Sequence, residues 1–292
     1  MKLSSDDLKS IAEDAILAAT KAGNLIQQFS QQNVKVEHKS GGDSIASQVV
    51  TEVDIKSEAI IIETLQASCE KFDLALLTEE TEDNKARLSK DYFWCVDPMD
   101  GTLAFTESVA GYSVSIALVE KSGQPLIGVV YDPVGHTLYA AIKGQGARRN
   151  GEPWSLPKQN NNQNELLQIV DRGNDYPKLK QALNSLAIKN GYSGIQRVES
   201  NGAVMNACSV LENGKAVYFK LPKQAQGGGS LWDFAATAAI FNELDAVATD
   251  VYGKPLDLNR PDSSYMNHRG VFFCTDQSLA TDIQALIKLC EQ

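Results

Sequence analysis

Apolar positions near the start of the chain recur at intervals of three and four residues. That spacing predicts a helix over residues 6–29, with Ser5 or Asp6 as its N-cap. A second helix is predicted from Asp54 toward Cys69, with a short strand at 34–36 and a polar loop at 40–43 before it. The pattern of the first helix rests on Leu8, Ile11, Ala15, Ile16, Ala19, Ala22, Leu25, Ile26 and Phe29.

Five short runs rich in β-branched and aromatic residues follow the second helix. They predict strands over residues 74–77, 93–96, 112–119, 126–131 and 137–142. Turn signals at Ser122-Gly123 and Asp132-Pro133 separate the last three runs. Short turns between strands favour antiparallel pairing, so these three runs predict a meander.

A polar stretch over residues 157–164 predicts a surface connection between two halves, residues 1–156 and 165–292. Beyond it, predicted helices and strands alternate. The helices cover residues 177–189, 203–211, 232–242 and 279–289, and the strands cover 195–198, 216–219 and 270–274. This alternation predicts an α/β fold of mixed α+β character.

Composition narrows the classes of partner. The formal net charge of −10 argues against a nucleic acid polymer but allows a small phosphate ester if cations screen the site. Because the chain has neither an apolar signal core nor a run of about 18 apolar residues, we expect a cytoplasmic protein without membrane contact. Five scattered cysteines with no CxxC pair indicate a reducing compartment. The three histidines form no HExxH motif, so zinc-dependent hydrolysis is unsupported.

Candidate chemistry centres on the apolar run at residues 93–96, which stops at Asp97 and Asp100, followed by Gly101 and Thr102. A buried strand would carry both carboxylates to the end of a sheet, where open α/β folds bind ligands. Pro98 would interrupt the hydrogen-bond ladder. Gly101 would let the backbone approach an anion, and the amides that follow could hold phosphate oxygens. The alternative interpretation is an ordinary strand that ends in an acidic turn.

Three other places carry carboxylates at the ends of predicted elements: Asp54, the pair Glu79 and Glu80, and Asp233. Taken singly, Asp54 and Asp233 could be helix caps, and Glu79 and Glu80 part of a solvated acidic loop. If they converge, they repel one another and raise one another's pKa values unless cations are present. A set of oxygen ligands without cysteine or histidine suits Mg²⁺ or Mn²⁺.

Three of these segments resemble the signature motifs of the inositol monophosphatase superfamily, in the same order and at similar separations. They are residues 78–80, 97–102 and 231–236, and residues 144–147, 150–151 and 253–258 also match. The resemblance implies a layered αβαβα sandwich of the sugar phosphatase type, a phosphomonoesterase activity, inhibition by Li⁺ and a homodimer. Its nearest branches are the 3'(2'),5'-bisphosphate nucleotidases and the inositol monophosphatases.

The resemblance also implies a role for each motif residue. One Mg²⁺ would be bound by Glu79, Asp97 and the Met99 carbonyl. A second would be bound by Asp97, Asp100 and Asp233. Glu80 would hold outer-sphere water or a third, weaker ion. Thr102 and Asp54 would orient and deprotonate a metal-bound water. Substrate would contact Asp100, Asp233 and the amides of Gly101 and Thr102. No phosphoenzyme is required, and Pro98 two residues before Asp100 does not fit the D-x-D-G-T pattern of the haloacid dehalogenase phosphatases.

Substrate choice depends on residues near the motifs. Residues 216–222 resemble the Tyr-x-Arg-Leu-Pro stretch of bisphosphate nucleotidases, with Lys220 in place of arginine. Lys220 would neutralise a second phosphate, or it is a solvated lysine at a strand edge. Leu103 departs from the lysine that many nucleotidases carry there, and Asp245-Ala246 replaces a usual pair of glycines. The Gly227–Gly229 loop would lie at the rim of the site.

These residues favour hydrolysis of 3'-phosphoadenosine 5'-phosphate to AMP and phosphate. The alternatives are an inositol-1-monophosphatase and, from another class, a non-catalytic relative that binds metal and anion.

Overall fold

A computed structural model describes residues 2–30, 36–38, 49–157, 164–173, 176–200 and 202–290. The helices of this part of the chain are α1 (Ser5–Phe29), α2 (Glu52–Phe72), α3 (Thr102–Thr106), α4 (Pro177–Lys189), α5 (Ala203–Asn213), α6 (Leu231–Glu243) and α7 (Gln277–Cys290), with a 3₁₀ turn η2 (Ala86–Leu88). The strands are β1 (Val36–His38), β2 (Val49–Thr51), β3 (Ala75–Thr78), β4 (Tyr92–Asp100), β5 (Ser113–Glu120), β6 (Pro125–Asp132), β7 (Thr137–Ile142), β8 (Gly146–Arg149), β9 (Glu152–Trp154), β10 (Leu166–Asp171), β11 (Ile195–Ser200), β12 (Ala216–Lys220), β13 (Val247–Thr249) and β14 (Val271–Cys274).

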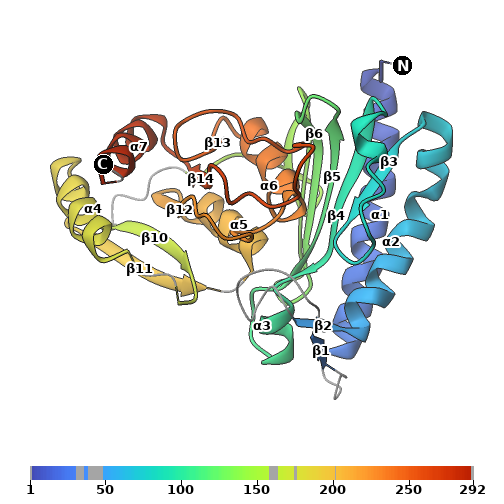
Figure 1. The fold of residues 1–292 in the computed structure, drawn as a ribbon, viewed down its shortest axis with the longest axis horizontal. Helices are drawn as coiled ribbons and strands as arrows, with labels where there is room; N and C mark the ends of the chain where they lie inside the picture. The colour runs from blue at the N-terminus through green and yellow to red at the C-terminus, as the bar shows by residue number, and fades with distance from the viewer. Residues whose placement is uncertain are drawn as a thin grey trace.

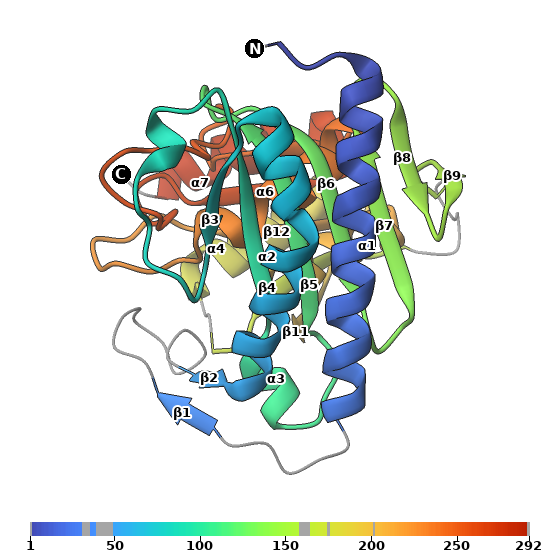
Figure 2. The same ribbon diagram turned by 90° about the vertical axis from the view of Figure 1, so that its right-hand side faces the viewer.

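The helices and sheets stack in five layers, as Figure 1 shows: α4 and α7, a five-stranded sheet, α5 and α6, a seven-stranded sheet, then α1 and α2. Figure 2 shows α1 and α2 side by side over the outer face of the seven-stranded sheet. The layered αβαβα architecture confirms the predicted fold class. In the large sheet the order is β3-β4-β5-β6-β7-β8-β9, and strands β5 to β7 form the predicted antiparallel meander.

Apolar side chains fill the spaces between these layers in three clusters. One lies between α1, α2 and the large sheet, and a second, around α5 and α6, joins the two sheets. The third packs the five-stranded sheet against α4 and α7. Because α6 packs on β5 and β6 and also contacts β13, a helix from the second predicted half covers the sheet of the first. The boundaries at residues 1–156 and 165–292 stay a prediction.

Several sequence predictions lie partly outside the described residues: most of the strand at 34–36, the loop at 40–43 and most of the connection at 157–164. The first helix begins at Ser5 with Ser4 as its N-cap, because Ser4 and Asp7 form a capping box. The strand β10 was missed, since the polar Gln168 interrupts its apolar run. Asp245 has the left-handed conformation (φ 55°) expected where a glycine is replaced.

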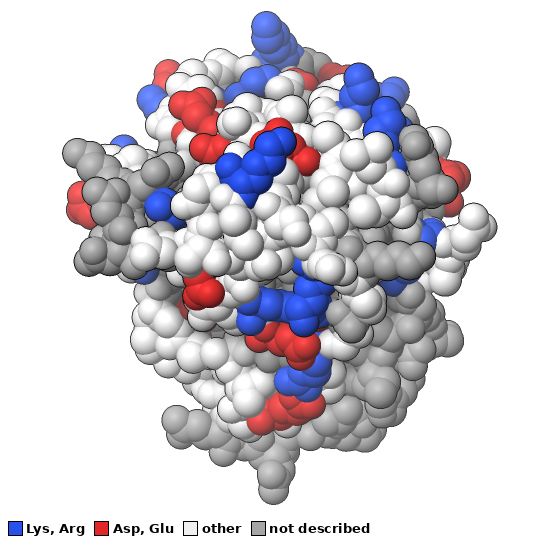
Figure 3. Space-filling view, turned by 90° about the vertical axis from the view of Figure 1, so that its left-hand side faces the viewer, with Lys and Arg blue, Asp and Glu red and all other residues white. Residues whose placement is uncertain are grey.

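The surface over α4 and α7 carries charges of both signs. Figure 3 shows Lys and Arg side chains interleaved with Asp and Glu on this face, without a broad field of one sign among its described residues. In the part of the chain that the structure describes, no helix has both the length and the apolar character that crossing a bilayer requires.

Candidate active site

Strand β4, an inner strand of the seven-stranded sheet, carries Asp97 and Asp100 at its C-terminal end. All nine residues of β4 are buried, and its pairing with β5 loses register between these two aspartates, where Pro98 lies. Two hydrogen bonds fix this break: the Met99 amide donates to Asp97 Oδ1 (3.0 Å), and Ser57 Oγ of α2 donates to the Pro98 carbonyl (2.7 Å). The strand therefore ends in a defined, buried turn that presents two carboxylates.

Asp54, in the first turn of α2, lies close to the end of β4. Its Oδ2 accepts hydrogen bonds from the amide (2.7 Å) and the hydroxyl (2.6 Å) of Thr51, which is the N-cap of the helix. The helix-cap interpretation of Asp54 is therefore correct, yet only one carboxylate oxygen serves it. The other, Oδ1, accepts a hydrogen bond from the Thr102 hydroxyl at 2.9 Å.

Asp54 and Thr102 form the pair that the resemblance predicts. The Thr102 hydroxyl also lies 3.1 Å from the Met99 carbonyl, and Asp54 is only 1% exposed. Burial raises the pKa of Asp54 from 3.8 to about 6, although the hydrogen bonds from Thr51 and Thr102 oppose the shift. A carboxylate with such a pKa is ionised at neutral pH and still accepts a proton readily, as a general base must.

Asp100 connects β4 to the start of α5. Its two carboxylate oxygens accept hydrogen bonds from the amides of Ala203 (3.1 Å) and Val204 (2.9 Å). Gly202 makes this approach possible, because a Cβ there would lie 2.7 Å from Asp100 Oδ2 and its φ of +77° is unfavourable for other residues. Burial, and then the nearby Asp233, raise the pKa of Asp100 well above its ordinary value.

Asp233 lies in the first turn of α6, where its carboxylate accepts a hydrogen bond from the amide of the N-cap residue Ser230 (3.1 Å). Gly229 leaves room for it, since a Cβ at this position would lie 2.7 Å from Asp233 Oδ2. Ser115 Oγ of β5 donates to the Trp232 carbonyl (2.9 Å) and ties the start of the helix to the large sheet. Burial, and then the charge of Glu79, raise the pKa of Asp233 to about 7.

Asp97, Asp100 and Asp233 form a cluster in which one carboxylate oxygen from each lies within 4.8 Å of the others. The raised pKa values of Asp100 and Asp233 reflect burial together with repulsion between like charges. A divalent cation would remove that repulsion, and three carboxylates with no sulfur or imidazole ligand are the donor set of a hard cation such as Mg²⁺. The residues present therefore fit a metal site.

Glu79 and Glu80 directly follow β3, which pairs in parallel with β4 so that Thr78 lies opposite Val96. This register brings Glu79 to the level of Asp97, and the charge of Glu79 raises the pKa of both Asp54 and Asp233. Both glutamates are half-buried rather than fully solvated. Glu79 is near the three-aspartate cluster without being one of its members.

Lys220 lies at the end of β12, between β10 and β14 rather than at a sheet edge. Its side chain is 16% exposed, and Nζ lies 3.2 Å from Asp171 Oδ2. Burial lowers the pKa of Lys220, but Asp171 and Asp233 outweigh burial and raise it overall. The interpretation of Lys220 as a solvated edge lysine is therefore wrong.

Sequence reasoning missed several residues that hold this site together. Asp171 forms the ion pair with Lys220 through Oδ2. Its Oδ1 accepts hydrogen bonds from Asn206 and Tyr218, each at 2.9 Å. Glu58 accepts hydrogen bonds from the hydroxyls of Thr78 and Thr81, on either side of Glu79 and Glu80. Helical spacing was the available signal for Ser57 and Glu58, because they lie three and four residues after Asp54.

The chain is similar to known proteins over most of its length. The model of the inositol monophosphatase family matches residues 7–285. The chain is 32% identical over 238 residues to the Nus factor SuhB of Haemophilus influenzae, covering 81% of this chain and 83% of that protein. It is 28% identical over 250 residues to the 3'(2'),5'-bisphosphate nucleotidase CysQ of Shigella flexneri, covering 85% and 94%.

Among solved structures, an IMPase/NADP phosphatase complexed with NADP and Ca²⁺ has a similar fold. The TM-score is 0.75 at 17% identity, and the match covers 98% of this chain and 97% of that one. At this level of identity the similarity concerns the fold alone.

Proposed function

The chain belongs to the inositol monophosphatase family and is a phosphoric monoester hydrolase, and we propose that it removes one phosphate from a 3'(2'),5'-bisphosphorylated nucleotide. The proposed reaction converts 3'-phosphoadenosine 5'-phosphate to AMP and phosphate. The proposed cofactor is Mg²⁺, in two or three ions per site, with Mn²⁺ as a substitute and Li⁺ as a competitor.

The proposed metal ligands are Glu79, Asp97, the Met99 carbonyl, Asp100 and Asp233, with Asp97 shared between two ions. The buried aspartate cluster supports this assignment. Divalent cations at such a site lower the pKa of bound water and stabilise the charge on phosphoryl oxygens. Glu80, on the adjoining segment, would hold outer-sphere water or a weaker third ion.

Asp54 and Thr102 have the proposed role of accepting a proton from the attacking water. The Thr102 hydroxyl donates to Asp54 Oδ1, so its lone pairs remain available to accept a hydrogen bond from water. A proton could then pass through Thr102 to Asp54. The amides of Gly101 and Thr102 would hold the phosphate. The intact pair speaks against a non-catalytic relative, which would not need it.

The observation that carries the choice of substrate is the position of Lys220. Its ammonium group is largely buried near Asp233 and is held by Asp171, whose own position is fixed by Tyr218 and Asn206. A cation in this position suits a second phosphate on the substrate. One feature favours inositol monophosphate as an alternative: Asp171 already balances the charge of Lys220, and a neutral polyol could lie beside the pair.

Replacing Lys220 tests this proposal. Losing a charged contact costs roughly 1.5–3 kcal/mol, so K220A should raise KM for 3'-phosphoadenosine 5'-phosphate about 10- to 100-fold. KM for adenosine 3'-phosphate, which lacks the second phosphate, should change little. The control is K215A, since Lys215 directly precedes the same strand at its other end.

Phosphate release should be measured for both nucleotides and for inositol 1-phosphate. Preferred turnover of inositol 1-phosphate by the wild-type enzyme, or equal losses for both nucleotides in K220A, would contradict the nucleotidase proposal.

A further inference from the structure

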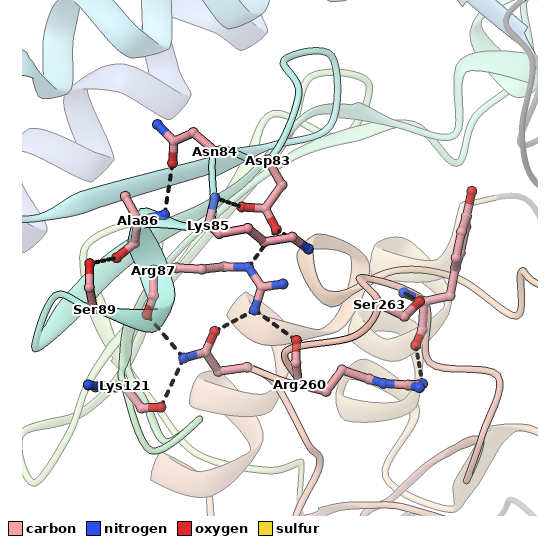
Figure 4. A network of polar contacts seen from close by, with 11 residues as sticks. Asp83, Asn84, Lys85, Ala86, Arg87, Ser89, Lys121, Arg260 and Ser263 are labelled. Atoms are coloured by element: carbon pink, nitrogen blue, oxygen red, sulfur yellow. Dashed lines mark hydrogen bonds and ion pairs between the residues drawn. The ribbon is translucent and has the colours of Figure 1, made fainter.

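A fully buried arginine joins two segments that lie far apart in the sequence. Arg87, in the turn η2, is 0% exposed. Its Nη1 donates to Asn259 Oδ1 (2.6 Å) and to the Arg260 carbonyl (2.9 Å), as Figure 4 shows. Asn259 donates in return to the Arg87 carbonyl (3.2 Å) and to the Lys121 carbonyl (2.9 Å). Arginine is seldom buried to this degree, so a specific role is expected.

One side of this network leads to Glu79 and Glu80. Arg87 Nε donates to Asp83 Oδ2 at 2.9 Å, and Asp83 lies only three residues beyond Glu80. The amide of Lys85 donates to the other oxygen of Asp83 and closes the turn. The two glutamates therefore belong to a segment whose C-terminal end, at Asp83, is held by Arg87.

The other side leads to Asp233. Arg260 Nη1 donates to the Tyr265 carbonyl at 3.1 Å, and Tyr265 pairs with Ser230 in an isolated antiparallel bridge. The Leu231 amide donates to the Ser264 carbonyl (2.9 Å) in the same contact. Ser230 is the N-cap of α6 and binds the Asp233 carboxylate. A continuous set of contacts thus runs from Arg87 to Asp233.

We infer that Arg87 is a positioning residue, which sets the separation between Glu79 and Asp233 by holding their two segments together. This inference rests on the proposed metal site. A guanidinium is required because its planar fork serves Asp83 and Asn259 at once, which the single ammonium of lysine does not. In the described part of the chain, Arg87 Nη2 is buried without a hydrogen-bond partner. The contacts to the two segments are made by Nε, to Asp83, and by Nη1, to Asn259 and the Arg260 carbonyl.

Binding of Mg²⁺ to the variant R87K tests the inference, with isothermal titration calorimetry on the folded protein as the readout. Outer contacts that orient metal ligands change affinity by roughly 10- to 100-fold, and we expect R87K to weaken Mg²⁺ binding by about 10-fold. Turnover at saturating Mg²⁺ should fall less than affinity does. The N259A variant, which leaves the Asp83 contact in place, should show a smaller loss, and the double variant should lose less than the sum of both.

The matched control is R269K. Arg269 also pairs with a buried aspartate, Asp250, which accepts hydrogen bonds from the amides of Tyr252 and Lys254. Among the described residues, the contacts of Arg269 do not lead to Glu79, so R269K should keep the wild-type Mg²⁺ affinity even if its Tm falls.

A lower Tm with unchanged Mg²⁺ affinity in R87K would overturn the inference. If R87K does not fold, wild-type affinity in N259A would overturn it equally. Failure of the wild-type protein to bind Mg²⁺ would instead refute the metal site itself.

Discussion

Replacing Asp54 by Asn should strongly reduce turnover and stabilise the fold at the same time. Asparagine keeps the shape of the side chain, and its carbonyl oxygen can accept the hydrogen bonds from Thr51. It cannot take a proton from water through Thr102. Loss of a general base lowers kcat by about 10²- to 10⁴-fold.

The gain in stability follows from the pKa of Asp54. Its folded-state pKa of about 6 lies above the ordinary value of 3.8, so the folded protein holds this proton more tightly than the unfolded chain. The ionised carboxylate therefore destabilises the fold above pH 6, by an amount that corresponds to roughly 3 kcal/mol. This penalty shrinks as the pH falls from 6 toward 3.8 and is absent below that value. D54N removes the penalty.

The free energy of unfolding should be measured by urea titration with chelator present, at pH 8 and at pH 4. D54N should exceed the wild type at pH 8 and match it near pH 4. The control is D7N, because Asp7 forms the same capping box in α1 but is exposed, and hydrogen bonds from Ser4 lower its pKa. D7N should lose stability at pH 8 and keep full turnover. If the free energy of unfolding of D54N differs from that of the wild type by the same amount at pH 8 and at pH 4, the reasoning is refuted.

Three further perturbations address the carboxylate cluster. D97N should lower kcat by at least about 10²-fold with little change in fold. Removal of divalent cations by a chelator should abolish phosphate release reversibly. Activity that survives chelation would exclude a metal-dependent mechanism. G229A should weaken Mg²⁺ binding measured by calorimetry, because a Cβ at Gly229 would lie 2.5 Å from the Phe234 ring and 2.7 Å from Asp233 Oδ2, so the first turn of α6 must shift. The control is G173A. Gly173 is exposed, has a positive φ as Gly229 does, and has open space where a Cβ would lie, so G173A should bind Mg²⁺ normally.

Periodicity predicted the mixed α/β character of the fold, and the motifs that resemble the inositol monophosphatase superfamily implied its layered arrangement. The same motifs contain the carboxylates that cluster in the structure. Asp54 illustrates the limit of such reasoning. Its position at the start of a predicted helix indicated a helix cap. The structure shows that one oxygen completes a capping box with the N-cap residue Thr51, while the other accepts a hydrogen bond from Thr102. The cap and the contact with Thr102 therefore coexist in one side chain, and the catalytic role of Asp54 stays a prediction.

Contacts between distant segments could not be predicted from local patterns. Asp171 was missed with its strand, and no spacing rule connects it to Lys220, 49 positions later in the chain. Arg87 and Asn259 are separated by 172 residues and meet only because the turn after β3 packs against the segment before β14. Such partners depend on tertiary packing, which a single sequence does not encode in any short pattern.

Three helix N-termini lie around the candidate site. Asp233 of the acidic cluster occupies the first turn of α6, Asp100 receives the first amides of α5, and Asp54, in the first turn of α2, accepts a hydrogen bond from Thr102. The partial positive charge of a helix dipole at each N-terminus favours nearby anions. The backbone itself therefore offsets part of the repulsion among the aspartates before any cation arrives. As a consequence, the frame of the site can fold first and receive its cations afterwards, and the same three dipoles favour the approach of an anionic phosphate.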